Sequence, residues 1–214
     1  MSFSVILPTL NENGHIIKLI EEISQILITQ KIQYEIIVVD DNSDDGTYET
    51  VKKFQQSATY LKVLSRKDKN RNLANSLNDG IFIAKFEHLI WLDADFQHPP
   101  KYISEFINKS KKFDVIICSR FLEESDRYFK NSKLEKEINE NQSYIFNKIC
   151  QKMLFKDITD YTSGFICIKR KFFNNFKLKG FYGDYFVDMI IELKKKKIRI
   201  LEIPFKDEER ASGS

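Results

Sequence analysis

Two carboxylates, an amide and an imidazole stand directly behind the apolar run that contains the chain's only tryptophan. They are Asp93, Asp95, Gln97 and His98, in the stretch HLIWLDADFQHPP. Carboxylate and amide oxygens are ligands that Mg²⁺ and Mn²⁺ prefer. An ion held by two or three protein oxygens keeps open positions for a diphosphate, whose departure it assists. Asp93, Asp95 and Gln97 are therefore candidate metal ligands. The simpler alternative is a turn whose aspartates cap a helix beginning near Pro99.

A second acidic stretch, VVDDNSDDGT at residues 38–47, also follows an apolar run. In nucleotide-binding folds, carboxylates at strand ends accept hydrogen bonds from ribose hydroxyls or from a base. We expect Asp40 and Asp41 to bind a nucleotide in this way. The other residues should shape a turn and cap the next helix, namely Ser43, Asp44, Asp45, Thr47 and a left-handed Gly46. A third stretch, PTLNENG at 8–14, places Glu12 where it could reach the same nucleotide.

The elements that must position these residues alternate between short apolar strands and longer helical patterns. Strands are expected at residues 3–8, 34–40, 59–65, 88–93 and 114–119, and helices at 14–29, 45–56, 71–86 and 99–111. The strands are apolar on both faces, as in the centre of a parallel sheet. The alternation predicts right-handed βαβ units in an α/β fold. Because ligands of open parallel sheets bind beyond the carboxyl ends of strands, the polar residues should meet in one cleft.

The pattern changes after Arg120. Residues 121–143 are polar and charged, without Gly or Pro, and predict either a solvated helix or a loop that orders when a ligand binds. Further elements are expected beyond this stretch: helices at 143–155 and 184–196, and strands at 164–169 and 198–205.

The composition is that of one globular domain, with 214 residues of which 42% are hydrophobic and 30% charged. A net charge of +3, from 34 basic and 31 acidic residues, does not favour nucleic acid as a partner. Three widely spaced cysteines are expected to be reduced thiols, which favours a cytoplasmic protein. We find no signal peptide and no apolar run near the ~20 residues that span a bilayer. Any membrane attachment should be peripheral or come from sequence beyond this chain.

Six stretches carry a resemblance to a known family: VILPTLNEN, EIIVVDDNSDDGT, WLDADFQHPP, ICSRF, DYTSGF and RASGS. In order and spacing they resemble family 2 glycosyltransferases of the GT-A fold, from about residue 3 to residue 214. Within that family they are most similar to the polyprenyl-phosphate glycosyltransferases, the group of dolichol-phosphate mannose synthase. The resemblance implies one Rossmann-like α/β domain, with a mainly parallel central sheet flanked by helices. Residues 1–120 would bind the nucleotide sugar and residues 121–214 the acceptor.

The resemblance also implies a reaction. A hexose, mannose or glucose, would pass with inversion from GDP-mannose or UDP-glucose to dolichyl or undecaprenyl phosphate, with Mg²⁺ or Mn²⁺ as cofactor. Because an acceptor phosphate is ionised at neutral pH, no strong general base is needed, and catalysis reduces to alignment and charge neutralisation.

Such an enzyme would be cytoplasmic and peripheral on the cytosolic face of a membrane, held by the membrane surface, an anchoring segment or a subunit. Relatives of this kind usually continue beyond RASGS, so we expect a catalytic domain cut before a membrane segment, or a short enzyme with a membrane partner. The run KKKK at 194–197 either approaches anionic headgroups or complements a helix dipole.

The implied roles fall on named positions of this sequence. On the donor side, the nucleotide would be contacted by Pro8, Glu12, Val39 and Asp41, and the diphosphate by Asp93, Ala94 and Asp95. The metal would be ligated by Asp95 and Gln97, and Arg210 would close over the diphosphate. On the acceptor side, Arg120 would contact the acceptor phosphate, and Asp160 and Ser163 the sugar or phosphate. The expected catalytic residues are thus Asp95, Arg120, Asp160 and Arg210.

The sequence departs from the family's pattern at two positions, and the segment before Asp160 is slightly short. Asn72 stands where a helix usually begins with Gly, and because Asn tolerates a left-handed cap conformation the fold should survive. Asn139 stands where an acceptor-binding Arg is expected. The replacement charge would come from Lys133, Lys136 or Arg127.

Three other functions stay open. A saccharide or protein hydroxyl could be the acceptor, and this reaction would require a carboxylate base, for which Asp160 is the first candidate. A nucleotidyltransferase would use a related sheet, but the Gly-rich phosphate loop that it needs is missing from PTLNENG. A non-catalytic nucleotide-sugar binding module would not need the metal-ready carboxylates.

Overall fold

The structure is a computed structural model, and it describes residues 1–67, 70–122, 134–180, 183–206 and 208, with the backbone alone at 134–141. The strands are β1 (Ser2–Thr9), β2 (Gln33–Asp40), β3 (Leu61–Ser65), β4 (His88–Trp91), β5 (Val115–Ser119), β6 (Ile166–Lys169) and β7 (Ile200–Pro204). The helices are α1 (Ile16–Thr29), α2 (Thr47–Phe54), α3 (Leu73–Ile83), α4 (Ile103–Lys109), α5 (Leu134–Met153) and α6 (Asp184–Lys195), with 3₁₀ turns η1 (Pro100–Tyr102) and η3 (Arg170–Phe173).

The described strands form one seven-stranded sheet in the order β3-β2-β1-β4-β6-β5-β7. Strands β1 to β4 pair in parallel, and so do β5 and β7, but β6 is antiparallel to both of its neighbours. Since β4 and β5 both oppose β6, they run in the same direction. The carboxyl ends of β1, β2, β4 and β5 therefore lie at one edge of the sheet.

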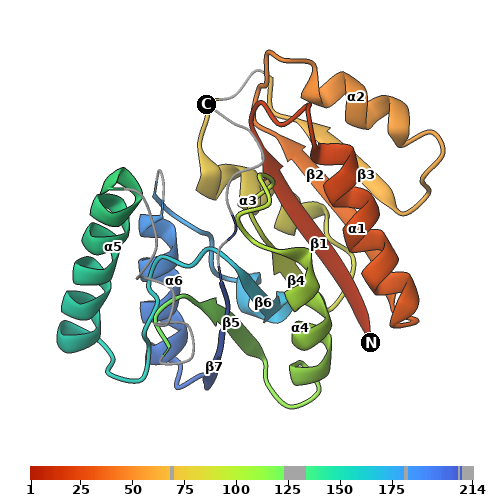
Figure 1. Cartoon of the computed structure of the whole chain (residues 1–214). Helices are drawn as coiled ribbons and strands as arrows, with labels where there is room; N and C mark the ends of the chain where they lie inside the picture. Colours follow the sequence, from red (N-terminus) through yellow and green to blue (C-terminus); the bar gives the residue numbers. More distant parts are fainter. Residues whose placement is uncertain (68–69, 123–133, 181–182, 207, 209–214) are drawn as a thin grey trace.

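Helices cover both faces of the sheet, which gives three layers (Figure 1). One apolar core lies between the sheet and helices α1 and α4, where Leu19, Ile23 and Phe106 are fully buried. The other lies between the sheet and helices α3 and α6, around Leu77 and Phe186. The expected single-domain α/β fold with a mainly parallel sheet is confirmed.

Helix α3 approaches the sheet unusually closely at Gly80. A Cβ atom on this residue would lie 2.5 Å from Cγ2 of Ile6 and 3.2 Å from Cγ2 of Val39. Glycine is therefore required here for packing, because any side chain would push the helix away from the sheet. The close approach fixes the beginning of α3 over the carboxyl ends of β1 and β2.

Helix α5 corrects the sequence-based boundary. It begins at Leu134, nine residues before the expected start at 143, and ends at Met153. The alternative of a helix for 121–143 is thus confirmed from residue 134 onward, whereas 123–133 lie outside the described residues. The sequence did not assign the early turns to this helix because they are mostly polar and show little helical periodicity.

The beginnings of α2 and α3 also differ from expectation, in the identity of the capping residue for α2 and in its conformation for α3. Ser43 and Asp44 do not cap α2, whose N-cap is Gly46, in the expected left-handed conformation at φ +87°. Asn72 is an extended N-cap with φ −169° rather than a left-handed residue, and its Oδ1 accepts from the backbone N–H of Asn75. An extended N-cap favours Asn over Gly because the side chain supplies a hydrogen bond that Gly lacks.

The three cysteines are free and buried, as expected. None of the helices in the described part of the chain combines the length and apolar character needed to cross a bilayer.

Candidate active site

A cleft of about 520 Å³ opens at the carboxyl ends of β1, β2 and β4. We call it the carboxyl-edge cleft. Its lining includes six of the residues that the sequence predicts for substrate binding, namely Pro8, Glu12, Asp41, Asp93, Ala94 and Asp95. The beginning of α3 and the residues before it add Arg71, Asn72 and Ser76 to the lining. The structure thus brings the residues of three separate acidic stretches to one place.

The loop after β1 is held in position by the turn before α2. The backbone N–H of Glu12 donates to Thr47 Oγ1 at 2.9 Å, and that of Asn13 donates to Asp45 Oδ2 at 2.9 Å. Asp45 also accepts from the backbone N–H of Thr47, so the turn residues serve structure as the sequence predicts. The Glu12 carboxylate contacts His15 Nε2 at 2.7 Å. Glu12 therefore reaches the cleft from a loop braced at both ends.

Asp41 is fixed at the cleft by a buried cation. Its Oδ1 pairs with Nη1 of Arg66, and its Oδ2 accepts from the backbone N–H of Asn72 at 2.7 Å. Arg66 is itself buried, and its Nε donates to Asp79 Oδ2 at 2.9 Å. The arginine links the ends of β2 and β3 to α3, so Asp41 presents its carboxylate to the cleft in one orientation.

The neighbouring Asp40 differs, because the structure does not bring it to the cleft. It is buried, its Oδ2 accepts from the backbone N–H of Ser43 at 3.2 Å, and burial raises its pKa. The side chain of Val39 is likewise buried in the core against α3. Of the residues expected at the end of β2, Asp41 is the one whose side chain lines the cleft.

The turn after β4 holds its two aspartates differently. The side chain of Asp93 is 45% exposed in the cleft. Asp95 is almost buried, and its Oδ1 accepts from the backbone N–H of Gln97 at 3.0 Å. Phe96, between Asp95 and Gln97, has φ +66°, a strained left-handed conformation for an aromatic residue. The two carboxylates are therefore set by the turn, and they do not cap η1, which lacks a side-chain cap.

His98 braces this turn rather than lining the cleft. Its Nδ1 accepts from the backbone N–H of Asp93 at 3.0 Å, and its ring stacks on Phe165 at 5.0 Å between centroids. Phe165 belongs to the DYTSGF stretch, directly before β6. The imidazole thus connects the acidic turn to the stretch that carries Asp160.

The donor set of the cleft fits a divalent cation that shares its ligands with a substrate. Asp93 and Asp95 supply two carboxylates on one wall, whereas Gln97 is not part of the lining. Among the described residues, no group of three or more His, Cys, Asp or Glu is placed to hold a metal ion by itself. Two protein carboxylates suit Mg²⁺ or Mn²⁺ when substrate phosphates and waters complete the shell.

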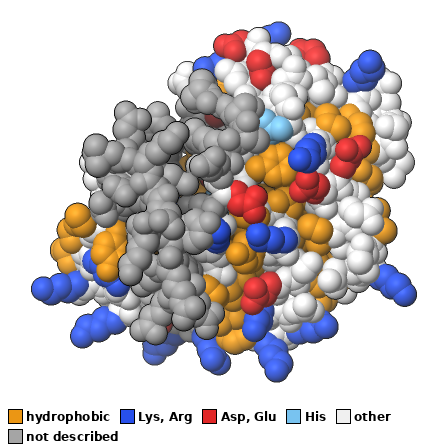
Figure 2. Space-filling model, viewed as in Figure 1, with side chains coloured by type: hydrophobic (Ala, Val, Ile, Leu, Met, Phe, Trp, Pro, Cys, Tyr) orange, Lys and Arg blue, Asp and Glu red, His pale blue; other side chains and the backbone are white. Residues whose placement is uncertain are grey.

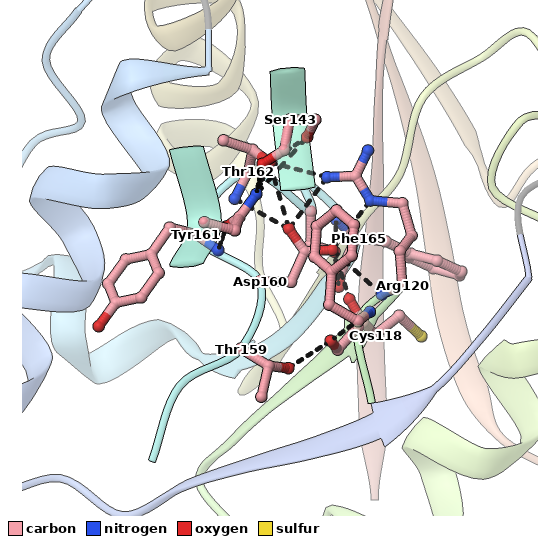
Figure 3. Close-up of polar contacts among 12 residues, drawn as sticks. Cys118, Arg120, Ser143, Thr159, Asp160, Tyr161, Thr162 and Phe165 are labelled. Atoms are coloured by element: carbon pink, nitrogen blue, oxygen red, sulfur yellow. Dashed lines mark hydrogen bonds and ion pairs between the residues drawn. The ribbon is translucent and has the colours of Figure 1, made fainter. Parts of the chain in front are cut away.

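A second polar cluster follows β5 and consists of Arg120, Asp160 and Thr162 (Figure 3). We call it the Arg120–Asp160 cluster. Asp160 is fully buried. Its Oδ2 accepts from Nε of Arg120 at 2.9 Å and from the backbone N–H of Arg120 at 3.1 Å, and its Oδ1 accepts from Nη2 at 2.9 Å. The backbone N–H of Thr162 adds a bond to Oδ1 at 3.0 Å.

Helix α5 extends this cluster on one side. Nη2 of Arg120 donates to Thr162 Oγ1 at 2.8 Å, and Nδ2 of Asn147 donates to the same oxygen at 3.0 Å. Oδ1 of Asn147 accepts from the backbone N–H of Tyr161. Asn147 thereby ties α5 to the DYTSGF stretch.

On the other side lies β7, where the carboxylate of Glu202 accepts from the backbone N–H groups of Thr159 and Asp160. Burial raises the pKa of Glu202 to about 7. Ser163 is buried, and its Oγ donates to the carbonyl of Cys118. The hydrogen bonds of Ser163 and Glu202 therefore hold the DYTSGF stretch in place.

Several sequence-based expectations lie outside what the structure describes. Arg210, Arg127 and Lys133 are outside the described residues, as are the side chains of Lys136 and Asn139. In contrast, two residues that sequence reasoning overlooked have clear positions at the site: Arg66, which pairs with Asp41, and Arg71, which lines the cleft. No local motif marks them, because each acts through partners distant in the sequence.

The fold is of the GT-A type, a three-layer α/β sandwich with acidic turns at the carboxyl edge of its sheet. The sequence pattern of the family described as Glycosyl transferase family 2 matches residues 4–176. The chain belongs to this family, which confirms the sequence-based resemblance.

One relative and two solved structures show how far the likeness extends. A dolichol-phosphate mannosyltransferase of Pyrococcus furiosus is 30% identical over the whole chain, which spans 58% of that protein's length. A glucosyl-3-phosphoglycerate synthase of Mycobacterium tuberculosis, solved with Mn²⁺, UDP and glucosyl-3-phosphoglycerate, superposes with a TM-score of 0.72 at 15% identity, covering 99% of this chain and 73% of that one. A mannosyl-3-phosphoglycerate synthase of Rubrobacter xylanophilus gives 0.73 at 14% identity, covering 100% and 68%. At such identities the structural likeness supports the fold alone.

Proposed function

We propose that this chain transfers a hexose from a nucleotide diphosphate sugar to a polyprenyl phosphate, with inversion at the anomeric carbon. The observation that carries the proposal is the pairing of two sites at one sheet edge: an open acidic cleft and a clamped arginine. The ends of β4 and β5 are separated by one strand, hence by about 10 Å. This span fits a sugar lying between a donor diphosphate and an acceptor phosphate.

On the donor side, the braced residues Glu12 and Asp41 would bind the nucleoside, and Asp93 and Asp95 would face the diphosphate. A divalent cation bound there, Mg²⁺ or Mn²⁺, would neutralise charge on the leaving diphosphate. Arg71 also lines the cleft, and unlike a bound cation its positive charge is part of the protein itself.

On the acceptor side, Arg120 would bind the acceptor phosphate while Asp160 holds the guanidinium in place. The side chain of Arg120 is partly exposed, so part of it faces solvent, whereas Asp160 is fully buried. Charge-assisted bonds of this kind fix the arginine before the ligand arrives.

The same geometry weighs against a hydroxyl acceptor. Both oxygens of Asp160 already accept hydrogen bonds from Arg120 and Thr162. A carboxylate whose two oxygens are occupied in this way is poorly placed to accept a proton from an acceptor hydroxyl. An acceptor phosphate needs no such base, and therefore agrees better with the contacts of Asp160.

The test is a transfer assay with the purified chain, Mn²⁺, labelled GDP-mannose or UDP-glucose, and three acceptors in parallel. These are a polyprenyl phosphate, 3-phosphoglycerate and a neutral saccharide. We expect label to become extractable into organic solvent with the polyprenyl phosphate alone. Water-soluble product with 3-phosphoglycerate or the saccharide would refute the acceptor. Binding of nucleotide sugar without turnover on any acceptor would indicate a binding module.

A further inference from the structure

Helix α5 carries an exposed apolar stripe on the side away from the Arg120–Asp160 cluster. The stripe consists of Ile145, Phe146, Ile149 and Met153, all of them exposed, with Met153 at 76%. The spacing 145, 149, 153 places side chains on one face of a helix, and Phe146 widens this face. Single exposed apolar residues are ordinary, but a continuous helical stripe indicates an interaction surface.

Lysines border the stripe. Lys148 and Lys152 are exposed and lie beside it on the same helix, and Lys156 follows the end of the helix. The basic end of α6 is close by, since Lys194 pairs with Asp157 and lies over the ring of Phe155. Figure 2 shows hydrophobic side chains at the lower left, over α5, with Lys and Arg side chains below them. An apolar face with a basic rim is typical of helices that lie on anionic lipid surfaces.

The opposite face of the same helix contacts the site. Asn147 and Ser143 bond to Thr162, whose hydroxyl accepts from Arg120. A groove of about 460 Å³ between α5 and α6 includes both Phe146 of the stripe and Thr162 of the cluster in its lining. Val187 and Ile191 give this groove an apolar side. The stripe is thus connected with the acceptor side of the site.

We propose that the apolar stripe of α5 binds an anionic lipid surface and sets the depth at which Arg120 meets the acceptor. Helices of this type bury their apolar face about 5–10 Å into the headgroup boundary. A helix is about 10 Å across, so the residues on its far side lie at headgroup level, where a lipid phosphate is found. The groove beside Phe146 would accept the first apolar units of the lipid. This proposal rests on the proposed function for the nature of the acceptor.

The test compares binding of the 214-residue chain to vesicles of phosphatidylcholine with phosphatidylserine and to vesicles of phosphatidylcholine alone, measured by flotation. We expect binding to the phosphatidylserine vesicles, weakened about tenfold or more by the double substitution Ile149→Glu and Met153→Glu. The matched control is Phe82→Glu, at an 87% exposed apolar residue on α3, which should bind as the unchanged chain does. The substitution Lys148→Glu with Lys152→Glu should weaken binding to phosphatidylserine vesicles, and more so at low salt.

A second measurement separates this proposal from the function. Transfer to a short, water-soluble isoprenyl phosphate does not require a membrane, so the double variant should retain it while losing transfer to long polyprenyl phosphate in vesicles. If the unchanged chain performs neither transfer but still binds the vesicles, the proposed function is refuted and the proposed binding of the stripe to lipid is not. Vesicle binding that is absent, or equal in the double variant, would overturn the lipid surface. So would sedimentation showing that the stripe joins two copies of the chain instead.

Discussion

The carboxyl-edge cleft and the Arg120–Asp160 cluster lie at the same edge of the sheet but treat their charges in opposite ways. In the cleft, the side chain of Asp93 is half-exposed, and Arg71 belongs to the same lining. In the cluster, Asp160 is fully buried and its oxygens are occupied by Arg120 and Thr162. Asp93 thus leaves its charge open to a ligand, whereas Asp160 uses its charge to build a rigid support. Carboxylates at one edge of the sheet can therefore suit different roles, and we expect Asp93 to bind and Asp160 to position.

The largest effect should come from removing Asp160, the carboxylate that holds Arg120 in place. Asp160→Ala leaves the Arg120 guanidinium without its carboxylate partner and removes the acceptor of two backbone N–H groups, those of Arg120 and Thr162, so we expect a loss of about 3–5 kcal/mol in the free energy of unfolding. Urea denaturation measures it. The matched control is Asp93→Ala, which removes a half-exposed carboxylate and should change stability by about 0.5 kcal/mol or less. Equal losses in both variants would remove the distinction between the regions.

The next effect concerns activity in the cleft. Asp95→Asn keeps an oxygen for the backbone N–H of Gln97 but removes the charge that, in the proposed function, would face the diphosphate. We expect transfer to fall about 100-fold, or roughly 2.7 kcal/mol in transition-state stabilisation, with unfolding nearly unchanged. Initial rates with saturating Mn²⁺ measure it. Glu87→Gln removes an equal charge from an exposed residue at the amino end of β4, away from the cleft, and should leave the rate unaltered. A normal rate for Asp95→Asn would exclude it from catalysis.

A smaller effect should reveal positioning within the cleft. Arg66→Lys keeps the charge but cannot bridge Asp41 and Asp79 with a planar fork. We expect the Kd for UDP or GDP to rise about tenfold, or 1.4 kcal/mol, while kcat stays near its original value. Calorimetry and a KM-against-kcat comparison measure both. Asp79→Asn disturbs Arg66 from the side opposite Asp41, so it should raise Kd less. If Arg66→Lys lowers kcat and spares Kd, then Asp41 does not bind the nucleotide.

The two regions also differ in how much the sequence reveals. Asp41, Asp93 and Asp95 each follow a strand directly, and parallel strands deliver their ends to one edge, so their meeting was predictable. The pairing of Arg120 with Asp160 spans forty residues and depends on β6 entering the sheet antiparallel between β4 and β5. Strand pattern alone does not specify that order. The family resemblance was enough to identify both residues as candidate site residues. It did not predict that they contact each other or that Asp160 is buried.

Arg66 and the early turns of α5 show two further limits. Arg66 stands after a short strand in a basic stretch that also contains Lys67 and Arg71, and nothing local distinguishes it from a surface arginine. Its role appears once β2, β3 and α3 are packed together. Residues 134–142 are mostly polar, and the two apolar residues among them, Leu134 and Ile138, are too few to mark a helix by apolar periodicity. The division at residue 120 into donor and acceptor halves stays a prediction.

The smallest effect tests whether the support region senses pH. The pKa of Glu202 is raised to about 7 from 4.5 by burial, so the folded chain holds this proton more tightly than the unfolded chain. The resulting stabilisation is complete below pH 4.5 and is lost as pH rises through about 7. Glu202→Gln mimics the protonated side chain, since its amide can donate to Thr159 Oγ1 while its oxygen accepts the backbone N–H groups.

Thermal unfolding of both proteins from pH 4 to pH 8 measures this contribution. We expect the Tm of the unchanged chain to fall relative to Glu202→Gln by a few degrees, with the difference developing between pH 4.5 and about 7. Glu192→Gln, on the surface of α6, is the control and should show no such divergence near pH 7. Parallel Tm profiles for Glu202→Gln and the unchanged chain would mean that the pKa of Glu202 is the same in the folded and unfolded chains. In that case its bonds to Thr159 and Asp160 offset its burial, and the support region would be insensitive to pH in this range.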